Sequence, residues 1–267
     1  MNLGLKGRTA VVTGGSKGIG KAIAKSLAGE GANVVLLARG KELLDKAAEE
    51  IKKSWVRVLA ISADITNTVS IGAAAKAAAD EFTTIHVVVN NAGGPIRRME
   101  RQITWPDSEW LDDVNLKTIG MLRVVQAFLP HMPRDGSGRV INISGIAGTS
   151  VFVPALTHGI NNAAMNHATT YLAQDLAGEQ ITVNAVVPGV IRTEWREAWA
   201  ENMGNQRGKT KADFLADYCK SMGIVTGRLG TVEEVADAVA FLASDRARYI
   251  TGARIPVDGG HSVNARP

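Results

Sequence analysis

Four polar residues in the second half of the chain have the side chains that proton transfer requires. Thr157, His158, Asn161 and Asn162 lie in the stretch PALTHGINNAAMNH, residues 154–167. The His158 imidazole can donate or accept a proton near neutral pH, because the unperturbed pKa of histidine is about 6.5. The pattern therefore favours an acid or base at His158. The alternative is a neutral histidine that donates to a backbone carbonyl.

The other histidines do not extend this group. His86, His131 and His261 are far apart in the sequence and lack the spacing to cysteines or carboxylates that a zinc site has. His167, nine residues after His158, is expected to be structural, and Tyr171 is expected to be a packing residue. We therefore expect no metal site.

Six short runs rich in β-branched residues predict the framework that must position these side chains. The segments between the runs are long enough for crossover helices, which parallel neighbouring strands need. The nearly continuous apolar character of the runs indicates strands buried on both faces. The sequence thus predicts an α/β fold, a doubly wound parallel sheet with helices on both faces. The runs are TAVVT (9–13), NVVLLA (33–38), VRVLAI (56–61), HVVVN (86–90), RVINIS (139–144) and TVNAVV (182–187).

No linker or internal repeat divides the chain, so we expect a single domain over residues 1–267. The least regular segment, residues 190–226, follows the sixth run. Because ligands of open α/β sheets bind outside the carboxyl ends of the strands, this segment is expected to form a lid or loop over the substrate. Trp195 and Trp199 within it favour an apolar or aromatic ligand, or else they cover the core or an interface.

The composition restricts the class of protein. The net charge of +4 is scattered along the chain without a basic run interleaved with aromatic residues, so no nucleic-acid partner is expected. One cysteine, Cys219, excludes an internal disulfide and fits a reducing compartment. No signal-peptide pattern and no apolar stretch of the roughly 18 residues that span a bilayer is found. We expect a soluble cytoplasmic protein without a membrane partner.

A glycine-rich loop joins the first run to an alanine-rich helix. In GGSKGIGKAIAKSLAGEGA, Gly14 and Gly18 can adopt positive φ and bring backbone N–H groups close to a pyrophosphate. Gly20 lets the helix pack tightly on the strand, and the helix N-terminus then faces the anion. The position of the loop between a strand and a helix at the start of an α/β series predicts a dinucleotide-binding domain.

The end of the second run indicates which dinucleotide binds. A site selective for NAD offers an acidic residue to the ribose 2′-hydroxyl at this point, but the chain has Ala38 and Arg39 there. The planar guanidinium of Arg39 can bind a 2′-phosphate, and Lys17 adds a second positive charge nearby. The two residues favour NADP(H).

With these residues identified, the chain resembles the short-chain dehydrogenase/reductase superfamily over almost its whole length. TGGSKGIG (13–20) is similar to the cofactor loop of that family, and NNAG (90–93) to the segment after its fourth strand. PGVIRT (188–193) is similar to the motif that contacts the nicotinamide amide, and YITGARIPVDGG (249–260) to the C-terminal strand of its carrier-protein ketoreductase-like members.

The resemblance implies a seven-stranded Rossmann-like sheet, a nicotinamide dinucleotide and, commonly, a homotetramer. It implies that Asp64 lies against the adenine and Asn90 near the adenine ribose. The cofactor-binding residues that it implies, together with those argued above, are Gly14, Ser16, Lys17, Gly18, Ile19, Gly20, Arg39, Asp64, Ile65, Asn91, Ala92, Gly93, Pro188, Gly189 and Thr193.

The family's catalytic Ser, Tyr and Lys positions hold other residues in this chain. Counting from both flanks places Gly145 at the Ser position, His158 at the Tyr position and Asn162 at the Lys position. A shift by one residue restores Ser144 but supplies neither Tyr nor Lys. Asn115, in DDVNLKT, matches the family's catalytic Asn. The candidate catalytic residues are therefore His158, Asn115, Asn162 and Ser144.

Three functions remain open at this stage. The leading one is an NADP(H)-dependent oxidoreductase that acts on a carbonyl or hydroxyl of a small molecule, with His158 as the substitute acid and Asn162 on the ribose. Its activity should then follow the titration of His158. The alternatives are a non-redox lyase-like or isomerase-like enzyme that uses the same pocket, and a catalytically inactive NADP-binding subunit.

Overall fold

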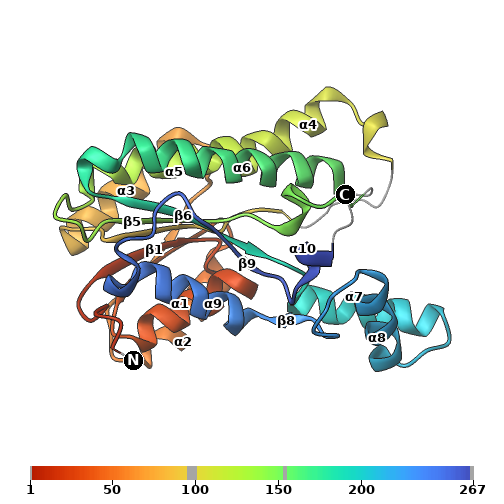
Figure 1. The fold of residues 1–267 in the computed structure, drawn as a ribbon. Helices are drawn as coiled ribbons and strands as arrows, with labels where there is room; N and C mark the ends of the chain where they lie inside the picture. The colour runs from red at the N-terminus through yellow and green to blue at the C-terminus, as the bar shows by residue number, and fades with distance from the viewer. Residues whose placement is uncertain (1, 95–100, 153–154, 265–267) are drawn as a thin grey trace.

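The computed structural model describes residues 2–94, 101–152 and 155–264 (Figure 1). The strands are β1 (Thr9–Thr13), β2 (Asn33–Ala38), β3 (Val58–Ser62), β4 (Val87–Asn90), β5 (Arg139–Ile143), β6 (Thr182–Pro188), β7 (Ile191–Arg192), β8 (Gly230–Thr231) and β9 (Arg254–Val257). The α-helices are α1 (Gly18–Gly29), α2 (Lys41–Lys52), α3 (Thr68–Phe82), α4 (Asp107–Val114), α5 (Gly120–Phe128), α6 (Leu156–Asp175), α7 (Glu194–Gln206), α8 (Lys211–Ser221), α9 (Val232–Ala243) and α10 (His261–Asn264). A π-helical turn, η2 (Asn115–Ile119), joins α4 to α5, and 3-10 turns include η1 (Gln102–Thr104) and η4 (Ile146–Gly148).

Seven strands form one parallel sheet in the order β3-β2-β1-β4-β5-β6-β9. All six runs predicted from the sequence are strands of this sheet, and β9 lies within the C-terminal motif. The strand order reverses between β1 and β4, which is where open α/β sheets bind their ligands. The predicted doubly wound parallel sheet is confirmed.

Helices cover both faces of the sheet, with α1, α2 and α9 on one side and α3, α5 and α6 on the other (Figure 1). Successive side chains of a strand point to opposite faces, so β1 contributes to two separate cores. Ala10 and Val12 belong to the core under α1 and α9, and Val11 belongs to the core under α3 and α5. Burial on both faces explains the nearly unbroken apolar strand sequences.

The segment expected to be irregular, residues 190–226, is mostly helical. Thr193 and Thr210 cap the N-termini of α7 and α8, each accepting a bond from a backbone N–H three residues later. The two helices enclose an apolar cluster of their own that includes Ala200 and Phe214. Trp199 packs edge-on against Phe214, so it covers this cluster, whereas the Trp195 side chain is half exposed. The segment is a helical pair beside the sheet (Figure 1).

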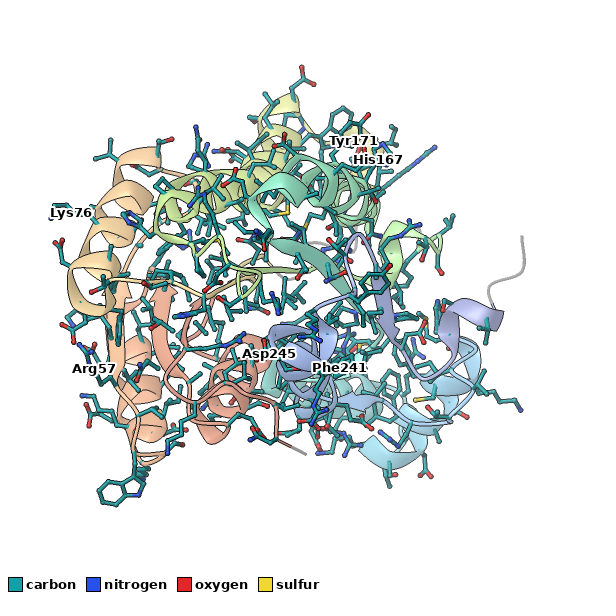
Figure 2. The ribbon with its side chains drawn as sticks, turned by 60° about the vertical axis from the view of Figure 1, so that its left-hand side comes forward. Arg57, Lys76, His167, Tyr171, Phe241 and Asp245 are labelled. Atoms are coloured by element: carbon teal, nitrogen blue, oxygen red, sulfur yellow. The ribbon has the colours of Figure 1, made fainter. Side chains whose placement is uncertain are left out.

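Tyr171 lies on the surface of α6. Its side chain is 67% exposed and packs edge-on against the ring of His167, which is also exposed. Both rings project outward from α6 (Figure 2). Tyr171 therefore packs against His167 at the surface, because residue 171 falls on the solvent side of α6. No helix in the described ranges is long and apolar enough to cross a membrane.

Candidate active site

The glycine loop between β1 and α1 has the geometry that the sequence predicts. Gly14 has a φ of 66° and Gly18 a φ of 54°, a conformation in which a side chain would be strained. A Cβ atom on Gly20 would overlap the carbonyl oxygen of Gly14 and the side chain of Asn91. The three glycines therefore allow the backbone to fold tightly at the N-terminus of α1, where N–H groups favour an anion.

Asn91 fastens this loop to the end of β4. Its side-chain Nδ2 donates to the backbone oxygen of Thr13 at 2.9 Å, and its own backbone N–H donates to Thr13 Oγ1 at 2.9 Å. The N–H of Ala92 donates to the same hydroxyl at 3.0 Å. The NNAG segment is thus bound to the glycine loop across the point where the strand order reverses.

The Asn90 side chain lies inside the sheet. Its side chain is 3% exposed, and its Nδ2 donates to Asn142 Oδ1 at 2.9 Å between β4 and β5. Asn142 in turn donates to Thr169 Oγ1 of α6 at 2.9 Å. These bonds join the sheet to α6, and the position of Asn90 near the adenine ribose stays a prediction.

Charged groups gather near the end of β2. Arg39 and Lys17 are both exposed, as groups that bind a phosphate must be. Asp64 is partly buried, and its pKa is lowered mainly by the backbone N–H of Thr66 and, more weakly, by the charge of Arg39. Ile65 is buried, and its carbonyl oxygen accepts from Arg123 at 2.7 Å. Arg39 and Asp64 therefore lie within electrostatic range of each other.

The PGVIRT segment reaches the same loop from β6. A Cβ atom on Gly18 would lie 3.8 Å from Thr193 Cγ2, so the side chain of Thr193 lies beside the glycine loop. Gly189 donates its N–H to the oxygen of Val257 at 2.9 Å, and a Cβ atom on Gly189 would overlap Asp258. The residues expected to bind the two ends of a dinucleotide are thus on one edge of the sheet, with Ser16 and Ile19 in the loop itself.

The polar residues of α6 are held by the segment from α4 to η2. Thr157 Oγ1 donates to Asp113 Oδ2 at 2.7 Å. One turn further along α6, Asn161 Oδ1 accepts from Thr118 Oγ1 at 2.6 Å. The following residue, Asn162, accepts a hydrogen bond at Oδ1 from Lys117 Nζ. These bonds fix the register of α6 against η2 more tightly than apolar packing alone would.

Lys117 is a site residue that the sequence analysis did not identify. Its side chain is 9% exposed, and burial lowers its pKa to about 8, with Asp113 acting in the opposite direction. One signal was available in the sequence. Lys117 precedes Met121, Val124 and Phe128 at the spacing of one helix face, and these three residues are buried. A charged residue on such a face is unusual.

Asn115 is not joined to this cluster through its side chain. Its Oδ1 accepts from Arg123 Nη2 at 3.1 Å, and Arg123 also donates to Ile65 and Thr68 at the start of α3. The amide therefore faces α3, whereas Lys117 reaches toward α6. Asn115 begins the π-helical turn, a feature that is frequent at functional sites.

Gly145 and Asn162 lie close together. A Cβ atom on Gly145 would be 2.9 Å from Asn162 Nδ2, which has no hydrogen-bond partner among the described residues although Asn162 is fully buried. A serine at residue 145 would crowd this amide. Neighbouring Ser144 is 7% exposed, and its hydroxyl also lacks a partner among the described residues.

His158 is neutral at working pH. Burial, followed by the nearby charge of Lys117, lowers its pKa to about 3. The expectation that activity follows a His158 titration near pH 6.5 is wrong, because a desolvated imidazole beside a cation resists a second positive charge. His158 can still donate one N–H or accept one hydrogen bond as a neutral ring.

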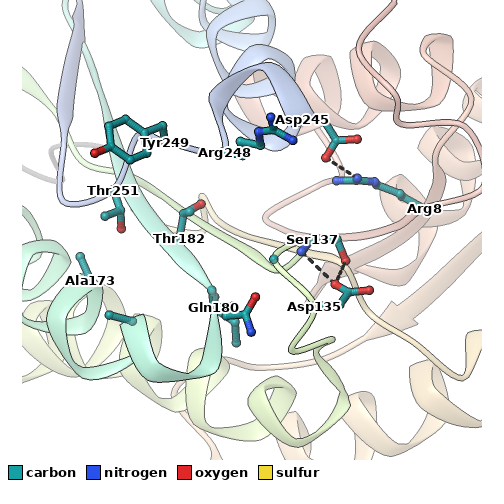
Figure 3. Close-up of a pocket in the computed structure, with 13 residues that line it drawn as sticks. Arg8, Asp135, Ser137, Ala173, Gln180, Thr182, Asp245, Arg248, Tyr249 and Thr251 are labelled. Atoms are coloured by element: carbon teal, nitrogen blue, oxygen red, sulfur yellow. Dashed lines mark hydrogen bonds and ion pairs between the residues drawn. The ribbon is translucent and has the colours of Figure 1, made fainter.

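A pocket of about 660 Å³ lies at the opposite end of the sheet (Figure 3). Its lining includes Arg8 before β1, Ser137 before β5 and Thr182 at the start of β6. Arg8 is paired with Asp245 at 2.6 Å. The pocket is therefore at the amino ends of the strands, away from the glycine loop. No group of three or more His, Cys, Asp or Glu side chains that could hold a metal occurs among the described residues.

Comparisons with known proteins find a family and relatives whose sequences match almost the whole chain. The family model for enoyl-(acyl carrier protein) reductase matches residues 14–262. The 3-oxoacyl-[acyl-carrier-protein] reductase FabG of Staphylococcus aureus is 35% identical over 254 residues, covering 95% of this chain and 97% of that protein. FabG of Pseudomonas aeruginosa is 34% identical over 258 residues, covering 97% of this chain and 98% of that protein.

Solved structures superpose on almost the whole chain. The L-sorbose reductase of Gluconobacter frateurii, in complex with NADPH and L-sorbose, superposes with a TM-score of 0.92 at 30% identity and covers 98% of this chain and 99% of its own. A short-chain dehydrogenase/reductase of Serratia marcescens superposes with a TM-score of 0.85 at 33% identity, covering 97% and 99%.

The glycine loop gives the first prediction, which compares two glycines at opposite ends of α1. Gly20→Ala should lower the thermal unfolding midpoint, because its Cβ overlaps the Gly14 carbonyl, whereas a Cβ atom on Gly29 would meet no neighbouring atom within 4 Å. Gly29→Ala should be neutral or stabilising by up to about 1 kcal/mol, as alanine favours a helix. Calorimetry on both variants checks this. Equal midpoints would contradict the tight packing of Gly20.

The second prediction concerns acid sensitivity. The folded-state pKa of His158 is about 3 and the unfolded value about 6.5, so the unfolded chain binds a proton first. Stability is therefore lost as the pH falls from about 6.5 toward 3. Between pH 7 and pH 5 the wild type should lose up to about 2 kcal/mol more than His158→Asn. Urea unfolding at both pH values measures the difference, and equal losses would show that His158 charges normally.

Proposed function

The chain belongs to the short-chain dehydrogenase/reductase superfamily, and on this basis we propose an NADP(H)-dependent oxidoreductase that acts on a carbonyl or hydroxyl group of a small molecule. We also propose that its catalytic residues differ from the Ser, Tyr and Lys that are usual in the superfamily. The observation that carries it is the glycine loop bound by Asn91 to the end of β4, beside the polar cluster on α6. The superfamily commonly forms homotetramers, and we propose this assembly and a cytoplasmic location here too.

The residues present fit a nicotinamide dinucleotide. A Cβ atom on Gly14 would meet Asn91 Nδ2 at 2.9 Å, so only a glycine allows this close packing, and a Cβ atom on Gly18 would meet only Thr193 Cγ2, at 3.8 Å. Both glycines have positive φ, the conformation in which the backbone can approach a pyrophosphate closely. Arg39 and Lys17 supply positive charge for a 2′-phosphate, and neither Ala38, the last residue of β2, nor the residue after it is acidic. Thr193 lies beside Gly18, where the nicotinamide end would be held. When bound, the cofactor supplies or accepts a hydride at nicotinamide C4.

The side chains of α6 would act on the substrate oxygen. Neutral His158 donates an N–H to it without adding charge, and the free Nδ2 of Asn162 is a second donor at the same end of the helix. The pair α7 and α8, which follows β6, would form a wall of the site and limit access of water. We propose residues 190–226 as the substrate lid, within a single dinucleotide-binding domain of residues 1–267.

Cofactor selectivity provides the third prediction. Arg39→Ala should weaken NADPH binding by about 10- to 100-fold, the value of a hydrogen bond between charged groups, and change NADH binding little. Arg57→Ala is the matched control, because Arg57 is exposed at the amino end of β3 and pairs with Glu81. Isothermal titration calorimetry measures both affinities. An equal loss for the two cofactors would exclude the 2′-phosphate contact.

Hydride transfer itself is the fourth prediction and the test of the function. NADPH carrying deuterium at C4, incubated with acetoacetyl-CoA, L-sorbose and 1-phenyl-1,2-propanedione, should label at least one alcohol product, as read by mass spectrometry. His158→Ala should slow the labelling by about 10²- to 10³-fold, the usual cost of losing one donor to the reacting oxygen.

Two results would contradict the oxidoreductase. Consumption of a substrate while NADPH stays unoxidised and the product unlabelled would indicate a non-redox enzyme. NADPH binding without any turnover, together with copurification of an intact homologous subunit, would indicate a binding subunit.

A further inference from the structure

Lys117 is a buried cation at the candidate site, and its place is unusual for a lysine. It lies in the π-helical turn η2, and its side chain is 9% exposed. Removing an ammonium from water costs several kcal/mol unless partners compensate. A buried charge of this kind, in the part of the sheet where ligands bind, indicates a functional group more often than a structural one.

The contacts of Lys117 place it where the reaction would occur. A Cβ atom on Gly93, in the loop after β4, would lie 3.7 Å from Lys117 Cδ and 3.8 Å from Cε. At its end, Nζ donates to Asn162 Oδ1 on α6. The side chain therefore runs from η2 past the end of β4 to the cluster that contains His158. A lysine ammonium has three donors, and the bond to Asn162 uses one of them.

Asn162 links Lys117 to the rest of the cluster. Its Oδ1 accepts from the lysine, while its Nδ2 points at Gly145 after β5 and has no partner among the described residues. A fully buried amide donor without a protein partner is costly. The arrangement leaves this donor available to a ligand oxygen placed between Lys117, Gly145 and His158.

From this geometry we propose that Lys117, held by Asn162, is the proton donor of the reaction, a role that rests on the proposed reductase function. In carbonyl reduction the carbonyl carbon gains a hydride from the reduced nicotinamide, which is oxidised. The π electron pair of the C=O bond moves to the oxygen, and that oxygen takes a proton. The proton comes from Lys117 Nζ, which becomes a neutral amine and regains a proton from solvent.

The charged and titratable groups around Lys117 support this assignment. Asp113 of α4 favours the protonated amine, burial disfavours it, and the pKa of Lys117 is lowered to about 8. His158 of α6 is neutral and does not compete for the proton. An acid with a pKa near the working pH transfers its proton efficiently, whereas a neutral imidazole does not.

The first test uses the cofactor-free protein. The folded pKa of Lys117 is below the unfolded value of 10.5, so wild-type stability should rise with pH between about 8 and 10.5. From pH 7 to pH 10, the unfolding constant of the wild type should fall by about 10- to 100-fold relative to that of Lys117→Met. Lys76→Met, at an exposed lysine paired with Asp80, is the control and should show no such change. A constant ratio between wild type and Lys117→Met would overturn the assignment.

The second test measures deuteride transfer in single turnovers, with the substrate that the wild type labels. Lys117→Met and Lys117→Arg should each lose about 10²- to 10⁴-fold in rate, because neither side chain releases a proton near neutral pH. The wild-type rate should fall as the pH rises through about 8, and Lys76→Met should keep both its rate and this decline. NADPH affinity should change less than tenfold in Lys117→Met.

The outcomes separate the two proposals. Labelling by the wild type that persists at full rate in Lys117→Met overturns the role of Lys117 and leaves the reductase intact. Failure of the wild type to label any product while it binds NADPH overturns the reductase, and the proton donor with it. A rate loss in Lys117→Met that the Asn162→Leu variant shares, with both proteins folded, supports the pair as a unit.

Discussion

The hydrogen bonds between Asn91 and the end of β1 hold together the two loops on which the rest of the site is built. Strands β1 and β4 are neighbours, but the sheet continues in opposite directions beyond them, so their crossover helices diverge. Thr13 Oγ1 accepts hydrogen bonds from two successive backbone N–H groups of the NNAG segment. These bonds join the end of β1 to the loop after β4 at the point where the crossover helices diverge. Gly20 packs against the Asn91 side chain, and Gly93, two residues further along the chain, packs against Lys117.

A second constraint acts between α6 and η2. Apolar packing has no direction, so it would let α6 slide or rotate by part of a turn. The bonds of Thr157, Asn161 and Asn162 to three residues of the α4–η2 segment, by contrast, require specific angles and distances. These contacts lie on the buried side of α6, which explains why that helix has polar residues where an apolar stripe would be expected.

The sequence was sufficient for the sheet and the glycine loop, because both depend on local patterns: β-branched runs and glycines at fixed spacing. Lys117 was missed, since its importance depends on a contact with Asn162, 45 residues away. The pKa of His158 was misjudged for a similar reason, as it is set by burial and by that same lysine. In residues 190–226, mixed charge suggested irregularity, although Thr210 followed by Asp213 is a helix-capping pattern.

The closeness of Lys117 and His158 has a consequence for the charge of the site. Desolvation disfavours both charges, and the charge of Lys117 further disfavours one on His158, so the pair carries at most one positive charge at neutral pH. Because Asp113 stabilises the lysine, the charge is on Lys117 and the imidazole stays neutral. A site with one mobile proton beside one neutral donor matches a reaction that delivers one proton to an oxygen for each hydride added to carbon. The α6 cluster has no lysine of its own, but an ammonium reaches it from η2 through the bond between Lys117 and Asn162.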